Sequence, residues 1–284
     1  MIYDSKNNIH QATEFYEKSF NKIISIPAQA PPSQDPKQQR INDMHHPQNQ
    51  VTFAKVCTNL AVCYEKLGNR AKALQLLQRI SKNPAFKNEQ NLANNLGVLH
   101  QRMGEYVKAQ EHLGQALDIV QQPKQSEEVS PIYKFGLNFN MGITMMRSGR
   151  YDEALNYLNK ARTILEVKIS DMAPSNLDQY GYDPKTNRIN LFVNLALVLQ
   201  KKGDLRDALE NSSEALKLAP TNDKIKILNE KIEMQLKEQE NSPDFQNKRK
   251  KVLKNHPNAE SLSSQHSRKS SLVTSAILAK SGKQ

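Results

Sequence analysis

The sequence has no tryptophan and only two cysteines, and aromatic residues make up 6% of its 284 residues. Such a small supply of large apolar side chains is lean for a globular enzyme of this length. No apolar run approaches the roughly 18 residues that a bilayer-spanning helix needs, and no signal-peptide pattern opens the chain. These absences predict a cytoplasmic protein without a membrane span.

Patterns of catalytic and metal-binding residues are missing too. No nucleophile elbow, Walker A motif, H-E-x-x-H motif or dinucleotide-binding glycine pattern occurs in a suitable context. Cys57 and Cys63 do not share one helix face, and no further Cys or His lies near them at zinc spacing. We interpret both as reduced core thiols. We therefore expect a protein that is not an enzyme, with no catalytic residues, no metal, no cofactor and no small-molecule substrate.

Positive charge is concentrated at one end of the chain. The net charge is +11, and from residue 239 onward nine Lys or Arg stand against three Asp or Glu. More than half of the positive excess therefore lies in the tail. The mildly basic remainder argues against nucleic acid as a partner of the main body.

What the sequence does contain is a repeat of two helical patterns joined by a glycine. Apolar residues return every three or four positions on both sides of that glycine, which indicates two amphipathic helices. A small residue recurs inside the first helix and an alanine inside the second. The turn glycines are Gly68, Gly104, Gly149 and Gly203; the small residues are Ala61, Gly97, Gly142 and Ala196; the alanines are Ala73, Ala109, Ala154 and Ala208.

This combination resembles the tetratricopeptide repeat, a helix–turn–helix unit of roughly 34 residues. The resemblance implies an all-α fold, a right-handed superhelix in which the small residues mark the closest approach of the two helices of a unit. Glycine within a helix costs about 1 kcal/mol relative to alanine, so Gly97 needs such a packing reason. The tryptophan that the family places at position 4 is absent here, where Cys57, Ala93, Asn138 and Phe192 stand.

The repeat divides the chain into four parts. A terminal helix with Ile225, Leu228, Ile232 and Leu236 on one stripe fits the capping helix that a solenoid needs. The first part is either a degenerate N-terminal cap or the remnant of a longer chain. The predicted parts are a partial unit over 1–26, a disordered Pro/Gln/Asn-rich linker over 27–50, repeats over 51–238 (units 54–86, 90–120, 132–168 and 189–222, cap 222–238), and a disordered Ser/Lys-rich tail over 239–284.

Three rows of similar residues are predicted to line the concave face of the solenoid. Within each first helix, position 6 is asparagine, position 9 is aliphatic and position 13 is basic, and 3.6-residue periodicity places all three on one face. The rows are Asn59, Asn95, Asn140 and Asn194; Val62, Val98, Ile143 and Leu197; and Lys66, Arg102, Arg147 and Lys201.

These rows predict the kind of partner. A side-chain amide carries both donors and an acceptor, so it can pair with the N–H and C=O groups of an extended peptide. The basic row favours acidic segments. The asparagine row resembles those of O-GlcNAc transferase and kinesin light chain, which implies a scaffold or adaptor that binds an extended, partly acidic peptide of another protein. A co-chaperone clamp for a C-terminal carboxylate fits poorly, since only the asparagine of that motif is matched.

Two other functions stay open. One is a structural subunit of a large cytoskeletal, ciliary or trafficking assembly, and the other is an RNA-associated protein that uses its basic tail. Lys248–Lys251 resembles a nuclear localisation signal, which makes the nucleus the alternative to the cytoplasm. Ser270 and Ser271 follow Arg268 and Lys269 and are candidate phosphorylation sites, where phosphate would add roughly −2 charge.

Overall fold

Every regular element in the described part of the chain is a helix. The computed structural model describes residues 6–24, 47–82, 90–122, 129–179 and 182–247. The elements are α1 (Lys6–Ile24), α3 (Pro47–Lys66), α4 (Arg70–Ser81), α5 (Gln90–Arg102), α6 (Tyr106–Gln121), α8 (Pro131–Arg147), α9 (Tyr151–Ile164), the π-helix η2 (Leu165–Ile169), α10 (Pro174–Gln179), α11 (Pro184–Lys202), α12 (Leu205–Leu218) and α13 (Asp223–Asn241).

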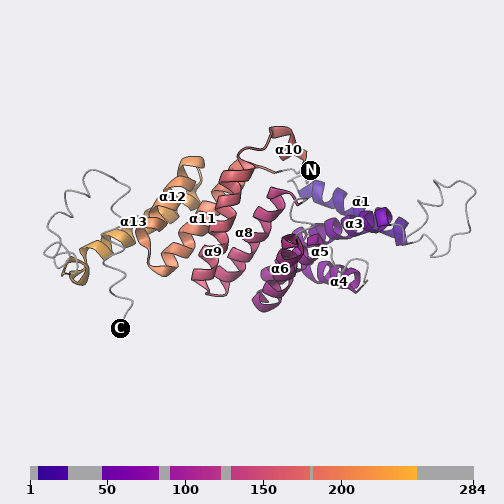
Figure 1. Ribbon diagram of the computed structural model, residues 1–284, viewed down its shortest axis with the longest axis horizontal. Coiled ribbons are helices and arrows are strands. Elements are labelled where there is room, and N and C mark those ends of the chain that lie inside the picture. The colour runs from indigo at the N-terminus through magenta and orange to yellow at the C-terminus, as the bar shows by residue number, and fades with distance from the viewer. Residues whose placement is uncertain (1–5, 25–46, 83–89, 123–128, 180–181, 248–284) are drawn as a thin grey trace, which may run out of the picture.

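The helices form successive antiparallel pairs. α3 packs on α4, α5 on α6, α8 on α9 and α11 on α12, and the second helix of each pair also contacts the first helix of the next. Figure 1 shows these pairs following one another along the long axis, with α1 beside α3 at one end and α13 beside α12 at the other. The predicted all-α superhelix of helix–turn–helix units is confirmed.

Some predicted boundaries differ from those of the structure. α3 begins at Pro47 within the expected linker, and α11 begins at Pro184, before the expected start of the fourth unit. α13 ends at Asn241, and residues 243–247 are helical, so the stretch 239–247 is not a disordered tail. α11 begins directly after its N-cap Asp183, and α13 ends directly before its C-cap Ser242. The rest of the linker and tail lies outside the described residues.

The four turn glycines adopt a backbone conformation that other residues avoid. Their φ angles are +81°, +81°, +81° and +86° at Gly68, Gly104, Gly149 and Gly203. At Gly203 the N–H donates to the Gln200 carbonyl at 3.1 Å, and the next N–H, of Asp204, donates to the Leu199 carbonyl at 3.0 Å. A left-handed residue satisfies the last carbonyls of the first helix in this way and reverses the chain.

Two helical glycines allow the paired helices to approach closely. A Cβ added to Gly97 would lie 2.6 Å from Leu113 Cγ, and one added to Gly142 would lie 2.7 Å from Leu158 Cγ. Both leucines are fully buried, and Ala109 beside Leu113 is fully buried too. The close approach of the two helices therefore explains these glycines, as the repeat predicted.

The segment between α9 and α11 packs against the core. Leu165 and Ile169 of η2 are buried, and Met172 and Leu177 lie against the same cluster of apolar side chains. The Tyr182 ring meets Phe135 of α8 edge-on, with centroids 6.0 Å apart. Burial raises the pKa of Tyr182 to about 12. The described residues of this insertion are thus part of the folded body.

Candidate peptide-binding groove

The first helices of successive units lie side by side, as a continuous concave face requires. α3 contacts α5, α5 contacts α8, and α8 contacts α11. The three predicted rows have uniform exposure along this face. All four asparagines and all four aliphatic residues are half-buried, and all four basic residues are exposed. Equivalent positions therefore have the same burial in all four repeats.

Five of the predicted residues meet in one hollow between α3 and α5. Val62 and Lys66 come from α3, and Asn95, Val98 and Arg102 come from α5. The hollow has a volume of about 100 Å³, and Leu77 and Leu99 form part of its wall. It offers an apolar floor with amide and basic groups at its edge, which suits a side chain of an extended peptide.

The asparagine amides also bind neighbouring groups of the protein. Asn59 Nδ2 donates to the Tyr16 hydroxyl of α1 at 3.3 Å, and Asn140 Nδ2 donates to Asn94 Oδ1 of α5 at 3.1 Å. Asn194 Nδ2 donates to the Asn190 carbonyl of its own helix at 2.7 Å. A primary amide has two N–H donors and an oxygen that accepts two hydrogen bonds, so each of these amides keeps capacity for a ligand.

A hydrogen-bonded link between α5 and α8 was not predicted from the sequence. The Asn94 amide that accepts from Asn140 itself donates to Asn95 Oδ1 at 3.4 Å. Gln101, only 5% exposed, donates through Nε2 to the Asn140 carbonyl at 2.9 Å and to Thr144 Oγ1 at 2.7 Å. Polar residues one position away from the predicted rows were the only signal in the sequence. This link fixes the register of the two first helices.

The basic row is partly neutralised at its N-terminal end. Arg102 forms an ion pair with Glu65 of α3, and the Glu65 side chain is only 14% exposed. Lys66, Arg147 and Lys201 are exposed on the same face. An acidic ligand would therefore meet its strongest positive field toward α8 and α11.

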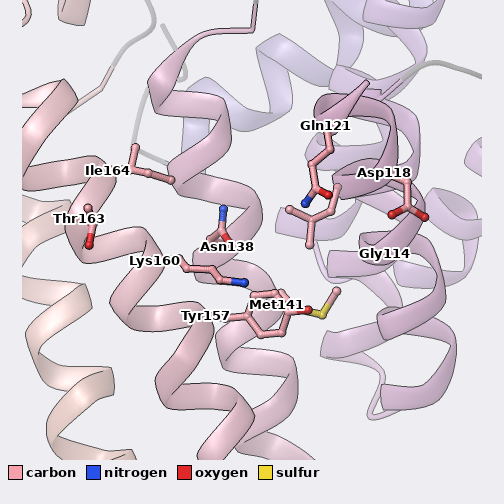
Figure 2. Close-up of a pocket in the computed structure, with 10 residues that line it drawn as sticks. Gly114, Asp118, Gln121, Asn138, Met141, Tyr157, Lys160, Thr163 and Ile164 are labelled. Carbon is pink, nitrogen blue, oxygen red and sulfur yellow. The ribbon is translucent and has the colours of Figure 1, made fainter. Parts of the chain in front are cut away.

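A larger hollow of about 630 Å³ lies between second helices and was not predicted (Figure 2). Gly114 and Asp118 of α6 stand on one side, Tyr157 and Lys160 of α9 on the other, and Asn138 of α8 lies between them. Lys160 Nζ lies 5.0 Å from the centre of the Tyr157 ring. A Cβ added to Gly114 would meet nothing within 4 Å, so close packing does not explain this glycine.

The cysteines are buried, free thiols, as predicted. Burial raises the pKa of Cys57 to about 12 and also raises the pKa of Cys63. Among the described residues, no group of three His, Cys, Asp or Glu side chains could hold a metal ion. The predicted phosphorylation sites Ser270 and Ser271 and the basic run Lys248–Lys251 lie outside those residues.

Comparison with known proteins identifies the repeat. The tetratricopeptide repeat family matches residues 59–84, 91–122 and 189–222. These three segments are tetratricopeptide repeats. The α8–α9 pair, between the second and third matched segments, has the same turn glycine and the same close approach at Gly142. A comparison with curated protein sequences finds no match.

Solved structures share the fold of this chain. BtubC (BKLC) from P. vanneervenii superposes with a TM-score of 0.58 and 15% identity, over 86% of this chain and 87% of that one. A chain of the anaphase-promoting complex hetero-tetramer Cut9-Hcn1 superposes with a TM-score of 0.50 and 18% identity, over 80% of this chain. The match spans 40% of the length of that second chain. At these identities the likeness concerns the fold alone.

In the described ranges, no helix combines the length with the apolar composition that crossing a bilayer demands.

Proposed function

We propose that this chain is an adaptor that binds an extended, partly acidic segment of a partner protein along the face formed by α3, α5, α8 and α11. Tetratricopeptide repeats indicate protein–protein interaction, and the hollow shared by Val62, Asn95, Val98 and Arg102 is the observation that favours this face. The asparagine row would bind the peptide backbone, and the aliphatic and basic rows would bind its side chains.

The hydrogen bonds within the protein limit the expected affinity. Each amide contact with a peptide contributes about 1 kcal/mol net, and ordering the peptide offsets much of that gain. Asn59, Asn140 and Asn194 each donate one hydrogen bond within the protein, whereas Asn95 only accepts one, so Asn95 keeps the most donor capacity for a ligand. The asparagine row alone therefore contributes less than about 4 kcal/mol, and the roughly 8 kcal/mol of a micromolar complex requires the aliphatic and basic rows as well.

Charge reversal on the proposed face tests the proposal without disturbing the core. Lys66→Glu, Arg147→Glu and Lys201→Glu together change three exposed side chains. A matched control reverses three exposed lysines of the terminal helix with Lys224→Glu, Lys226→Glu and Lys231→Glu. Affinity capture followed by titration of the captured partner should show loss of binding in the first variant and wild-type binding in the control.

The amides need a separate variant. The double variant Asn95→Ala, Asn194→Ala should bind the same partner with lower affinity. The control Gln75→Ala, Asn156→Ala removes exposed amides from second helices and should bind it with wild-type affinity. If the charge-reversed chain keeps the wild-type set of partners, binding occurs through another surface and the proposal is wrong.

A further inference from the structure

A third hollow, of about 660 Å³, lies between the second helices α9 and α12, with α11 behind it. Five carboxylates surround it, although the chain as a whole carries a net charge of +11. They are Glu166, Asp204, Asp207, Glu210 and Glu214.

These carboxylates are only partly neutralised. Asp204 lies 3.8 Å from Lys202 Nζ, and Glu214 lies 2.6 Å from Lys217 Nζ. Glu166, Asp207 and Glu210 make no ion pair with any described residue. The one cationic side chain that lines the hollow, Arg162, already donates to Asn211 Oδ1 and lies 5.7 Å from the Phe192 ring. The hollow therefore presents excess negative charge to a ligand.

The floor of the hollow is apolar. Leu155 of α9 and Phe192, Leu195 and Leu199 of α11 line it. A segment that fits both features would carry several positive charges with one or two aliphatic side chains between them. Residues 248–254 of this chain have that composition, with five Lys or Arg surrounding Val252 and Leu253.

The end of the described chain lies within reach of the hollow. Arg206, in the first turn of α12, forms an ion pair with Glu240 near the end of α13 at 2.5 Å, and Gln246 Nε2 donates to the Glu240 carbonyl at 2.6 Å. The chain is therefore held, at Gln246, close to the first turn of α12, which also carries Asp207. Seven extended residues span roughly 23–25 Å, and the hollow extends along α12 for roughly 15 Å, so the segment is long enough.

We propose that residues 248–254 bind in the α9–α12 hollow of the same chain. The lysines and Arg249 pair with the carboxylates of α12 and Glu166, and Val252 and Leu253 contact the apolar floor. Because several carboxylates lie together in a partly enclosed site, they attract the basic segment more strongly than one carboxylate of an isolated surface ion pair would. This attraction weakens as the salt concentration rises. This docking covers the basic run and is independent of the concave groove.

Limited proteolysis of the full chain tests this docking, because trypsin cleaves after Lys and Arg. Cleavage within residues 248–251 should be slow relative to cleavage after Arg268, which serves as the internal reference. Neutralising the unpaired carboxylates with Glu166→Gln, Asp207→Asn and Glu210→Gln should accelerate the first cleavage about five-fold, since each exposed pair contributes modestly.

The matched control neutralises carboxylates elsewhere with Glu111→Gln, Asp223→Asn and Glu230→Gln. Asp223 lies in the first turn of α13 as Asp207 does in α12, so both variants lose the same helix-terminal charge. The control should cleave at the wild-type rate. Raising the salt concentration about ten-fold on the wild-type chain should remove the protection without any substitution.

Two results would overturn the proposal. Equal cleavage in the wild type and both variants, unchanged by salt, would show that the segment does not dock. Protection from cleavage that increases with protein concentration would show that the segment in the hollow belongs to a second copy of the chain, not to the same chain.

Discussion

Asn140 of α8 donates a hydrogen bond from its side-chain amide to Asn94 Oδ1 of α5 at 3.1 Å. The same residue therefore connects two repeats and lies in the row proposed to bind a peptide. Stability and binding are coupled at this position, so substitutions in the asparagine row have to be compared individually.

We expect Asn140→Ala to lower the free energy of unfolding by about 1 kcal/mol, because it removes the bond between helices. Asn194→Ala should leave stability unchanged or slightly higher, since Asn194 bonds only to its own helix and alanine is the better helix former. Urea unfolding of both variants measures this difference. Equal losses would show that the bond between Asn140 and Asn94 does not hold the repeats together.

The helical glycines should respond in opposite directions to alanine. Gly97→Ala places a methyl group 2.6 Å from Leu113 Cγ, and we expect a loss of about 1–3 kcal/mol from overpacking. Gly114→Ala meets nothing within 4 Å and should gain about 0.5–1 kcal/mol from helix propensity. Thermal unfolding of the two variants makes the comparison. Destabilisation by Gly114→Ala would mean that the hollow in Figure 2 is more crowded than its geometry indicates.

Tyr182 tests whether the insertion before α11 belongs to the folded body. Its hydroxyl is buried without a hydrogen-bond partner in the described structure, so Tyr182→Phe should leave stability equal or higher. Tyr182→Ala removes a half-buried ring that packs on Phe135 and should cost about 1–3 kcal/mol. Denaturant unfolding separates the two cases. An alanine variant as stable as the wild type would contradict the packing described for this segment.

The His100–His112 stack predicts that stability depends on pH. The rings are 5.3 Å apart, and burial lowers the pKa of His112 below its ordinary value of 6.5. The unfolded chain then binds more protons than the folded one, so the free energy of unfolding falls as the pH drops from 7 through 6.5.

Glu105, whose pKa is lowered mainly by its hydrogen bond to His100, acts in the same direction but only near and below 4.5. Unfolding measurements between pH 7 and 5.5 should therefore report His112, and His112→Gln should remove much of the dependence in that window. A variant with the wild-type slope would assign the effect to other groups.

Much of the fold could be read from local patterns in the sequence. The turn glycines need a left-handed backbone, and small residues at Gly97 and Gly142 need a close helix, so both requirements appear as residue types at fixed spacing. The orientation of the three rows also follows from helical periodicity, because the residues of one row occupy equivalent positions in each repeat.

Contacts between repeats were decided only by the tertiary structure. The partners of Asn59 and Asn140, the packing of Tyr182 and the acidic hollow beside α12 depend on how successive pairs stack and on helices that extend past the repeat. Such contacts join residues far apart in the sequence through side chains with no shared period. The sequence alone therefore determined the repeat unit and its faces, whereas stacking decided which polar groups bind each other and which remain for a ligand.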